Sequence, residues 1–328
     1  MNAMMKNRKK KTKGRLSAAL IAGMLLLSIL PGSAFAAAAP AAPEPEAGTL
    51  TVTDDLGRSV EVPRNPRRVA ALIGSFADIW LLADGPETLA ATASDAWTSF
   101  DIPLMEDTVN LGSAKDFSLE ALILSDPDLI LASTNTAVNL DHLEIFEDWG
   151  VPTLYFNVES FDDYLRMLEI CTAISGRPER YRQYGEAVAD QVEKAVARQD
   201  GSAPSVLYIR ASGTGGKVKG STGNVLGEML AELGCVNIAD DNQTLLENLS
   251  LEAILTADPD YIFLLYQAAD PSEAERVLQE SLLQNPAWAS LTAVREGRCY
   301  VMEHRLYNLK PNAQWGTAYE RLAEILYG

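Results

Sequence analysis

The sequence predicts an α/β protein of two lobes, each with a mostly parallel sheet, joined by a long rigid helix. Three observations carry this prediction. One stretch of sequence occurs twice without a gap, at residues 118–131 and 250–263. Strand and helix patterns alternate on both sides of the middle of the chain. Between them, residues 161–199 contain no strand pattern. A duplicated unit on each side of a helical segment indicates two lobes of similar design.

The repeated stretch reads Ser-Leu-Glu-Ala near its start and Asp-Pro-Asp near its middle. Ser118 and Ser250 stand where a hydroxyl can cap the first turn of a short helix. The proline then ends the helix, because it biases the preceding residue away from helical angles. The apolar runs Leu129–Ala132 and Tyr261–Leu265 follow, and unbroken apolar runs are typical of strands inside parallel sheets. Because both motifs agree in the two copies, duplication is favoured over chance.

The first 36 residues predict a signal peptide. A basic start precedes the apolar run Leu16–Leu30, and Ala34-Phe35-Ala36 fits cleavage after small residues. An uncut anchor is the alternative, although the run is shorter than the about 20 residues that span a bilayer. No cysteine precedes Cys171, so we expect no lipid-modified cysteine at the cleavage site. We expect an exported protein, located in the periplasm or at the cell surface. Residues 37–48, rich in alanine and proline, predict a linker.

Composition excludes several functions. Residues 37–328 contain 20 basic and 45 acidic side chains, and a net charge of −25 repels nucleic acid. There are only two histidines, His142 and His304, and no Gly-x-Ser-x-Gly elbow, so we expect neither an enzyme nor a bare-metal site. Three cysteines without a Cys-x-x-Cys pattern predict three buried free thiols, with pairing of Cys235 and Cys299 left open.

The predicted first lobe covers residues 49–160. Alternating apolar residues on either side of Asp54–Gly57 predict a hairpin. Further strands are expected at 68–73, 88–93 and 152–156, and helices at 76–83 and 140–149, besides the first copy of the repeat. Trp97 lies in a predicted polar loop.

Linking helices are predicted over residues 161–203, at 161–174 and 178–199. The second of these would span about 33 Å at 1.5 Å per residue, which suits a strut between lobes. The second lobe, residues 204–328, begins with a strand at 205–209. The glycine-rich stretch 213–223 matches no phosphate-binding loop and predicts a flexible loop at the rim of a cleft.

Several motifs resemble one known family. They are Thr-Val-Thr-Asp-Asp-Leu-Gly-Arg at 51–58, Pro-Arg-Arg-Val-Ala at 66–70, the two halves of the repeat, Gly-Glu-Met-Leu at 227–230, Gly-Cys-Val-Asn-Ile at 234–238 and Asn-Pro-Ala-Trp at 285–288. In this order they resemble ABC-importer substrate-binding proteins of the helical-backbone branch that carries ferric siderophores, haem and vitamin B12. The resemblance covers residues 49–328. This sequence differs from many Gram-positive members of the family, which carry a lipidated cysteine that is absent here.

The resemblance implies two lobes joined by a long helix, a ligand cleft between the lobes and little hinge motion. It also implies an extracytoplasmic receptor that captures a ferric siderophore and delivers it to the membrane subunits of an ABC importer. A corrinoid or haem receptor is the first alternative, a bare-metal receptor the second and an exported enzyme the last. We expect a monomer with no resident cofactor. The sequence does not decide which chelate binds, because specificity depends on loop side chains that vary within one fold.

The ligand site is expected outside the carboxyl ends of the strands, where ligands gather in open α/β sheets. The residues predicted to bind ligand are Ser75, Phe76, Trp97, Thr134, Asn135 and Asn157 in the first lobe, and Arg210, Tyr266, His304, Arg305, Tyr307 and Lys310 in the second. Trp97 would stack on an aromatic chelate and Arg210 would pair with its charge. A haem would instead need an axial histidine, tyrosine or methionine. By the resemblance, Asp78 and Glu228, each on the first helix of its lobe, are predicted to dock on permease arginines.

Overall fold

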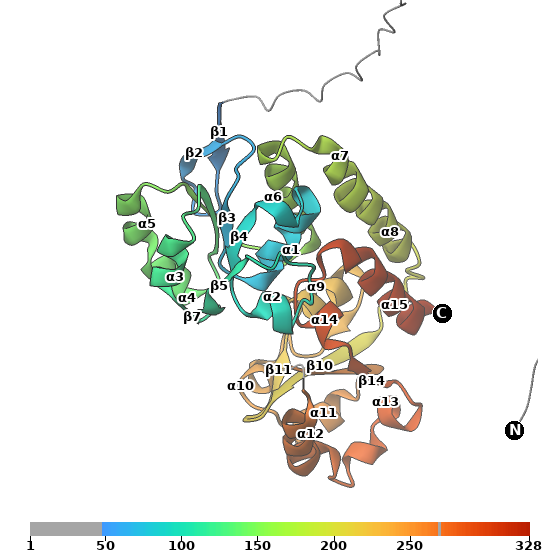
Figure 1. Cartoon of the computed structure of the whole chain (residues 1–328). Coiled ribbons are helices and arrows are strands. Elements are labelled where there is room, and N and C mark those ends of the chain that lie inside the picture. Colours follow the sequence, from blue (N-terminus) through green and yellow to red (C-terminus); the bar gives the residue numbers. More distant parts are fainter. Residues whose placement is uncertain (1–47, 268–269) are drawn as a thin grey trace, which may run out of the picture. The chain divides into compact units, whose positions relative to one another are not determined.

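The computed structural model describes residues 48–267 and 270–328, which form two α/β lobes and the helices that connect them (Figure 1). The predicted fold class is therefore confirmed. The predicted signal peptide, residues 1–36, and residues 37–47 of the predicted linker lie outside the described residues. Among the helices described, none has the length and apolar character needed to cross a bilayer.

The first lobe is built on a fully parallel sheet with the strand order β5-β4-β3-β8-β9. Its helices cover both faces, with α1 and α6 on one side and α3, α4 and α5 on the other (Figure 1). The strands are β1 (Thr49–Thr53), β2 (Ser59–Pro63), β3 (Val69–Ala71), β4 (Leu89–Thr92), β5 (Val109–Asn110), β6 (Gly112–Ser113), β7 (Asp116–Phe117), β8 (Leu129–Ser133) and β9 (Thr153–Phe156). The helices are α1 (Gly74–Ala83), η1 (Pro86–Thr88), α2 (Asp95–Thr98), α3 (Leu119–Leu124), α4 (Ala137–Asp141) and α5 (Leu143–Trp149).

Two expectations for this lobe are wrong. The predicted polar loop around Trp97 contains the helix α2, which at four residues is too short to leave a periodic pattern. The predicted helix 140–149 is two helices, α4 and α5, which meet at His142. The His142 ring packs against Phe117 and Phe146, and its Nδ1 lies 2.7 Å from the carbonyl oxygen of Val138.

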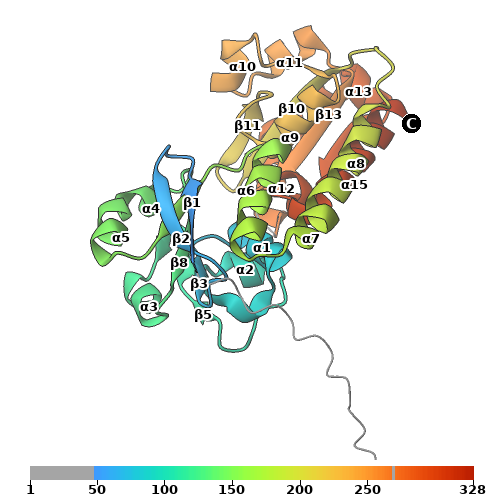
Figure 2. The same ribbon diagram turned by 90° about the horizontal axis from the view of Figure 1, so that it is seen from above.

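Helices α6 (Phe161–Ile174), α7 (Pro178–Tyr181) and α8 (Ala187–Val196) connect the lobes. A π-helical segment, η2 (Arg182–Glu186), joins α7 to α8, so the predicted strut is continuous but ends at residue 196 rather than 199. Gly185 lets this segment pack closely, since a Cβ atom there would lie 2.8 Å from the Tyr181 ring. Helix α8 runs along α15 (Trp315–Tyr327) of the second lobe (Figure 2).

The second lobe has the strand order β11-β10-β13-β14, and β12 also pairs with β10. Only β11 is antiparallel among these strands. The strands are β10 (Ser205–Ser212), β11 (Gly215–Lys219), β12 (Val236–Asn237), β13 (Tyr261–Tyr266) and β14 (Cys299–Met302). The remaining helices are α9 (Val225–Glu232), α10 (Gln243–Glu247), α11 (Leu251–Ala257), α12 (Ser272–Leu278), η3 (Gln279–Leu283), η4 (Trp288–Ser290), α13 (Thr292–Arg295), α14 (His304–Tyr307) and η5 (Asn312–Gln314).

The glycine-rich stretch is not the flexible loop that the sequence predicts. Residues 215–219 form β11 and pair with the end of β10. The alternation Lys217-Val218-Lys219 is a strand pattern in which Val218 is buried. Gly216 allows the hairpin to lie against the lobe, because a Cβ atom there would come within 2.9 Å of Leu278.

The two copies of the repeat are alike in local structure. Ser118 accepts the N–H of Ala121 at 3.1 Å, and Ser250 accepts the N–H of Ala253 at 3.3 Å, so both predicted N-caps are confirmed. The residue before each proline, Asp126 or Asp258, has a positive φ, of 45° and 39°. In both copies, therefore, a residue with positive φ follows the helix and precedes the proline.

The last aspartate of each copy ties two strands together. Asp128 accepts the N–H groups of Arg67 and Arg68, at 2.8 and 3.1 Å, just before β3. Asp260 accepts the N–H of Ser205, the first residue of β10, at 2.8 Å. In each lobe the carboxylate thus aligns the start of the repeat strand with that of its neighbour. This agreement in hydrogen bonding supports the duplication.

One apolar core is shared by both lobes. Separate clusters cover the outer faces of the two sheets, whereas the central cluster contains side chains of both lobes and of the connecting helices. Trp315 is fully buried there, with its ring 5.8 Å from that of Phe161 on α6. Residues 48–267 and 270–328 accordingly belong to a single compact unit.

All three cysteines are free, as predicted, but only Cys171 is fully buried. Cys235 and Cys299 are partly exposed. Burial nevertheless raises the pKa of the Cys235 thiol to about 12 and that of Cys299 to about 11. Both side chains are therefore protonated near neutral pH.

Candidate functional site

Two cavities lie between the lobes, at the carboxyl ends of strands from both sheets. The smaller, about 130 Å³ in volume, is called here the Lys310 cavity and is lined by Asn135, Val158, Glu159, Tyr208, Arg210, Gly223, Asn224, Val225, Tyr307, Asn308 and Lys310. The larger, about 390 Å³, is called the His304 cavity and is lined by Thr98, Ser99, Tyr266, Pro271, Val301, Met302, Glu303, His304 and Arg305. This is where ligands gather in open α/β sheets.

The first lobe gives the Lys310 cavity a fixed polar wall. The side-chain amide of Asn135 donates to Asn157 Oδ1 at 2.5 Å and to Glu159 Oε1 at 3.0 Å. The backbone N–H of Asn157 in turn donates to Asp55 at 2.6 Å. These bonds hold side chains that follow β8 and β9 in one arrangement.

The second lobe contributes cations to the same cavity. Tyr208 and Arg210 alternate along β10, and their partners on β11 are Lys219 and Lys217. Paired residues of antiparallel strands place their side chains on the same face, so the three cations of this hairpin lie together. Lys310 reaches the cavity from the segment after α14. Among the ion pairs of residues 48–267 and 270–328, none involves Arg210, Lys217, Lys219 or Lys310.

The surroundings disfavour the charged form of two of these lysines. Burial lowers the pKa of Lys310, while the more distant carboxylates of Glu159 and Asp95 act in the opposite direction. Burial also lowers the pKa of Lys219, and the nearby charges of Arg210 and Lys217 lower it further. An anion bound in this cavity would relieve both effects, because an opposite charge favours the protonated amine.

The His304 cavity is more apolar and contains an imidazole in a defined orientation. His304 Nδ1 lies 2.9 Å from the carbonyl oxygen of Tyr266. Because a carbonyl oxygen only accepts, Nδ1 carries the proton, and in the neutral ring Nε2 keeps its lone pair. Tyr266 and Met302 are among the other residues that line it.

Seven of the twelve predicted ligand-binding residues line these cavities. They are Asn135, Arg210, Tyr307 and Lys310 in the Lys310 cavity, and Tyr266, His304 and Arg305 in the His304 cavity. Two of them already use their polar groups elsewhere. The hydroxyl of Tyr307 donates to the carbonyl of Ala318 at 3.0 Å, and Arg305 is bound to Asp78.

The other five predicted residues line neither cavity. Phe76 is fully buried and packs edge-to-face on Phe156, which makes it a core residue. Ser75 is buried too, and its carbonyl accepts from Asn312. Trp97 is 37% exposed on α2 but lines no inter-lobe wall. Asn157 accepts a hydrogen bond from Asn135, and the Thr134 hydroxyl donates to the carbonyl of Phe156.

Sequence reasoning missed Glu159, Tyr208 and Asn308. For two of them, the spacing to a predicted site residue could have indicated the position. Tyr208 precedes Arg210 by two residues on one strand and therefore shares its face. Glu159 likewise follows Asn157 by two residues in an extended segment.

The two residues predicted to dock on the permease differ in environment. Asp78 is only 15% exposed, and its carboxylate accepts from Arg305 at 3.0 Å and from Asn312 at 2.8 Å. Docking through Asp78 would require these bonds to open. Glu228 is half-exposed in the first turn of α9, and one of its oxygens accepts the N–H of Gly223 at 3.0 Å. The docking role therefore stays a prediction, carried mainly by Glu228.

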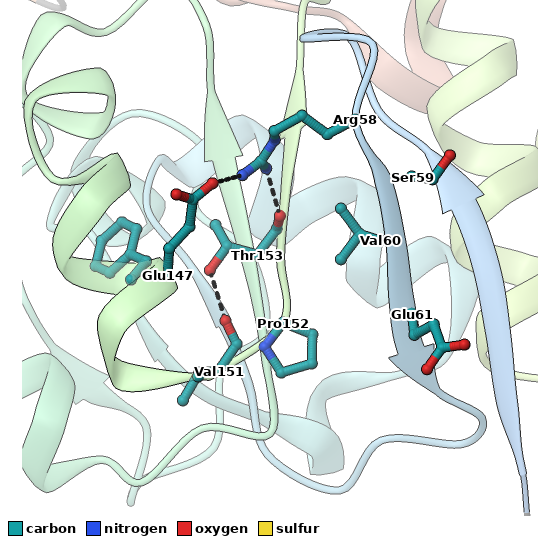
Figure 3. A pocket seen from close by; sticks show the side chains of 10 residues that line it. Arg58, Ser59, Val60, Glu61, Glu147, Val151, Pro152 and Thr153 are labelled. Atoms are coloured by element: carbon teal, nitrogen blue, oxygen red, sulfur yellow. Dashed lines mark hydrogen bonds and ion pairs between the residues drawn. The ribbon is translucent and has the colours of Figure 1, made fainter.

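A third cavity, of about 360 Å³, lies beside the β1–β2 hairpin (Figure 3). Its cation, Arg58, already donates to Glu147 at 3.0 Å, to the carbonyl of Thr153 at 2.8 Å and to Asp54. The cavity also faces the amino end of β9, opposite the edge where ligands gather. We therefore place the candidate site between the lobes.

A bare metal ion has no evident site in the described part of the chain. No group of three or more His, Cys, Asp or Glu side chains is arranged there to hold one. A lone imidazole such as His304 suits a metal that arrives with most of its ligands already in place.

Comparison with known proteins identifies the fold. The family described as "Periplasmic binding protein" matches residues 69–306. The periplasmic heme-binding protein RhuT from Roseiflexus sp. RS-1 has 22% identity and a TM-score of 0.64, with 80% of this chain and 98% of that chain covered. The petrobactin-binding protein YclQ from Bacillus subtilis has 16% identity and a TM-score of 0.66, with coverage of 85% and 97%.

The vitamin B12-binding protein BtuF of Vibrio cholerae has 18% identity and a TM-score of 0.64, with 80% of this chain and 98% of that chain covered. No curated protein sequence matches the chain. The three similar structures thus share one fold, and each carries a different ligand in its name.

Proposed function

Because the chain belongs to the periplasmic binding protein family, we propose that it captures an anionic ferric siderophore outside the cytoplasm and delivers it to an ABC importer. This family consists of binding proteins rather than enzymes. The proposed ligand lies between the lobes and contacts the Lys310 cavity. No resident cofactor takes part.

One observation carries this proposal. Arg210 and Lys310 line one cavity, and Lys217 and Lys219 are paired with Arg210 and Tyr208 on the adjoining strand. None of these four cations forms an ion pair among the described residues, although residues 37–328 carry a net charge of −25. Clustered cations that are partly desolvated repel one another, so the site is suited to an anion. Ferric complexes of catecholates and carboxylates are anionic, bulky and coordinatively saturated. They need charge and shape from the protein rather than metal ligands.

Native mass spectrometry of the mature protein tests the proposal. The panel consists of a ferric tricatecholate, ferric citrate, a neutral ferric trihydroxamate, haem and cobalamin. We expect a one-to-one complex with an anionic ferric chelate and a weaker one, or none, with the neutral trihydroxamate. Retention of none of the iron complexes would contradict the proposal.

A haem or corrinoid is the second candidate, and the orientation of His304 favours it. With Nδ1 bonded to the Tyr266 carbonyl, Nε2 can serve as an axial ligand in a cavity walled by Tyr266 and Met302. The absorbance spectrum of the haem-loaded protein separates the two candidates. Axial ligation predicts a Soret shift that His304→Ala abolishes and His142→Ala leaves unchanged. If the protein is a siderophore receptor that does not ligate haem iron, we expect no such Soret shift.

Docking on the permease is tested with Glu228→Lys. Charge complementarity steers association, so reversing this charge is expected to lower cellular uptake of the ⁵⁵Fe chelate by about tenfold without changing its affinity. Glu252→Lys is the matched control, because Glu252 is an exposed acid in the first turn of another helix of the same lobe. Normal uptake by the Glu228 variant would rule the docking role out.

The shared core predicts little motion on binding. Side chains of both lobes and of α6 and α8 pack in one cluster, and closing a hinge would have to break it. We expect the radius of gyration from solution scattering to be nearly the same with and without the chelate. A contraction of several ångströms would show that the helical connection bends.

A further inference from the structure

The direct hydrogen bonds that the structure describes between the two lobes meet at one point. Within residues 48–267 and 270–328, only three such bonds join the first lobe to the second: Arg305 to Asp78, Asn312 to Asp78 and Asn312 to the carbonyl of Ser75. Every one of them has its donor in the segment 304–312. The acceptors all lie in the first turns of α1, directly after β3.

Arg305 holds this segment from two sides. Its Nη1 donates to the carbonyl oxygen of Lys310 at 2.8 Å, while Nη2 donates to Asp78 at 3.0 Å. The guanidinium also lies over the Phe100 ring, 4.5 Å from its centre. Arg305 therefore connects the backbone of Lys310 to Asp78 and Phe100 of the first lobe.

Asn312 takes part in this inter-lobe contact in an unfavourable conformation. It is fully buried, it has a positive φ of 56°, and its Oδ1 has no hydrogen-bond partner among the described atoms. Its Nδ2, however, donates to both Asp78, at 2.8 Å, and the Ser75 carbonyl, at 3.0 Å. Backbone strain and an unsatisfied acceptor persist where the surrounding structure requires them.

Burying the ion pair is also unfavourable by itself. Burial raises the pKa of Asp78 and lowers that of Arg305, against the opposing effect of their contact. In a buried ion pair the desolvation cost opposes the attraction between the charges, and such pairs can serve to fix one geometry.

We propose that Asp78, Arg305 and Asn312 form an inter-lobe latch that fixes the segment 304–312 against the first lobe. The latch sets where Lys310 and His304 stand relative to the opposite walls of their cavities. The three residues are positioning residues, since they act on the ligand through this segment. The inference deepens the proposed function, but its test requires no ligand.

Hydrogen–deuterium exchange of the ligand-free full chain tests the latch. The amides of Leu306 and Tyr307 donate to the carbonyl of Glu303, and that of Asn308 donates to His304, so these amides report the opening of the segment. Asp78→Asn removes the charge, and Asn312→Gly removes the side chain while suiting the left-handed backbone. We expect these amides to exchange about tenfold faster in both variants, with β10 and β13 unchanged.

Asp84→Asn is the matched control. Asp84 is a buried acid at the other end of α1, and it pairs with Arg177 at 2.8 Å without joining the lobes. We expect wild-type exchange in segment 304–312 of this variant. Unchanged exchange in a folded Asp78 or Asn312 variant would overturn the latch, as would an increase spread evenly over β10 and β13. Because no chelate is present, the result does not depend on the identity of the ligand.

Discussion

Arg210→Gln and Lys310→Met are each expected to lower the affinity for the anionic ferric chelate by roughly 10- to 150-fold. Each variant removes one cation from the Lys310 cavity, and we expect the fold to stay intact because neither side chain makes an ion pair within the described residues. Hydrogen bonds to charged groups contribute about 1.5–3 kcal/mol, and about 1.4 kcal/mol corresponds to a tenfold change in affinity. Quenching of tryptophan fluorescence during titration measures the effect.

Lys194→Gln is the control for these variants. Lys194 is an exposed cation on α8, away from both inter-lobe cavities, so its loss changes only the net charge. Adding salt should weaken binding of the wild type more than that of either cavity variant, because screening acts on the charges they lack. Equal affinities for the wild type and both cavity variants would move the ligand away from the Lys310 cavity.

Trp315→Ala is expected to lower the free energy of unfolding by about 3–5 kcal/mol, the usual cost of removing a buried tryptophan. Trp315 is fully buried between Phe161 of α6 and Tyr319 of α15, in the cluster that both lobes share. Because the cluster is continuous, urea unfolding should remain one transition that shifts as a whole.

Trp97→Ala provides the comparison, since this tryptophan is 37% exposed and its removal should cost far less. Two separate unfolding transitions in the Trp315 variant, with only one of them shifted, would contradict a shared core. So would a destabilisation no larger than that of Trp97→Ala.

Much of the fold follows from local sequence. Ser118 and Ser250 cap helices, and Asp128 and Asp260 each bind the start of a neighbouring strand. The residues of the repeat thus make the hydrogen bonds that define its own helix and strand. The errors arise where length or periodicity is insufficient. Helix α2 has four residues, and the strand character of β11 is masked by the glycines around it.

The candidate site was predictable only in part, for a physical reason. Asn135, Arg210 and Lys310 reach one cavity, because parallel strands bring their carboxyl ends and the following loops to the same edge. Their role in binding stays a prediction. Long-range pairing, however, leaves no local pattern. Asp78 and Arg305 are 227 positions apart, so an acid on the first helix looks solvated until the second lobe is placed against it.

Phe76 shows the same limit. It lies near the carboxyl end of β3, where ligand-contacting residues are expected, yet as a residue of α1 it packs inward on Phe156 of β9. Whether a residue after a strand faces the cleft or the core depends on how the next helix packs.

The most direct test of the account is an iron anomalous-difference map from crystals of the protein grown with the ferric chelate that it retains. We expect one iron peak between the lobes, with the chelate in contact with Arg210 and Lys310 and with His304 Nε2 not bonded to the metal. An iron peak in the cavity beside the β1–β2 hairpin, or outside the space between the lobes, would contradict it.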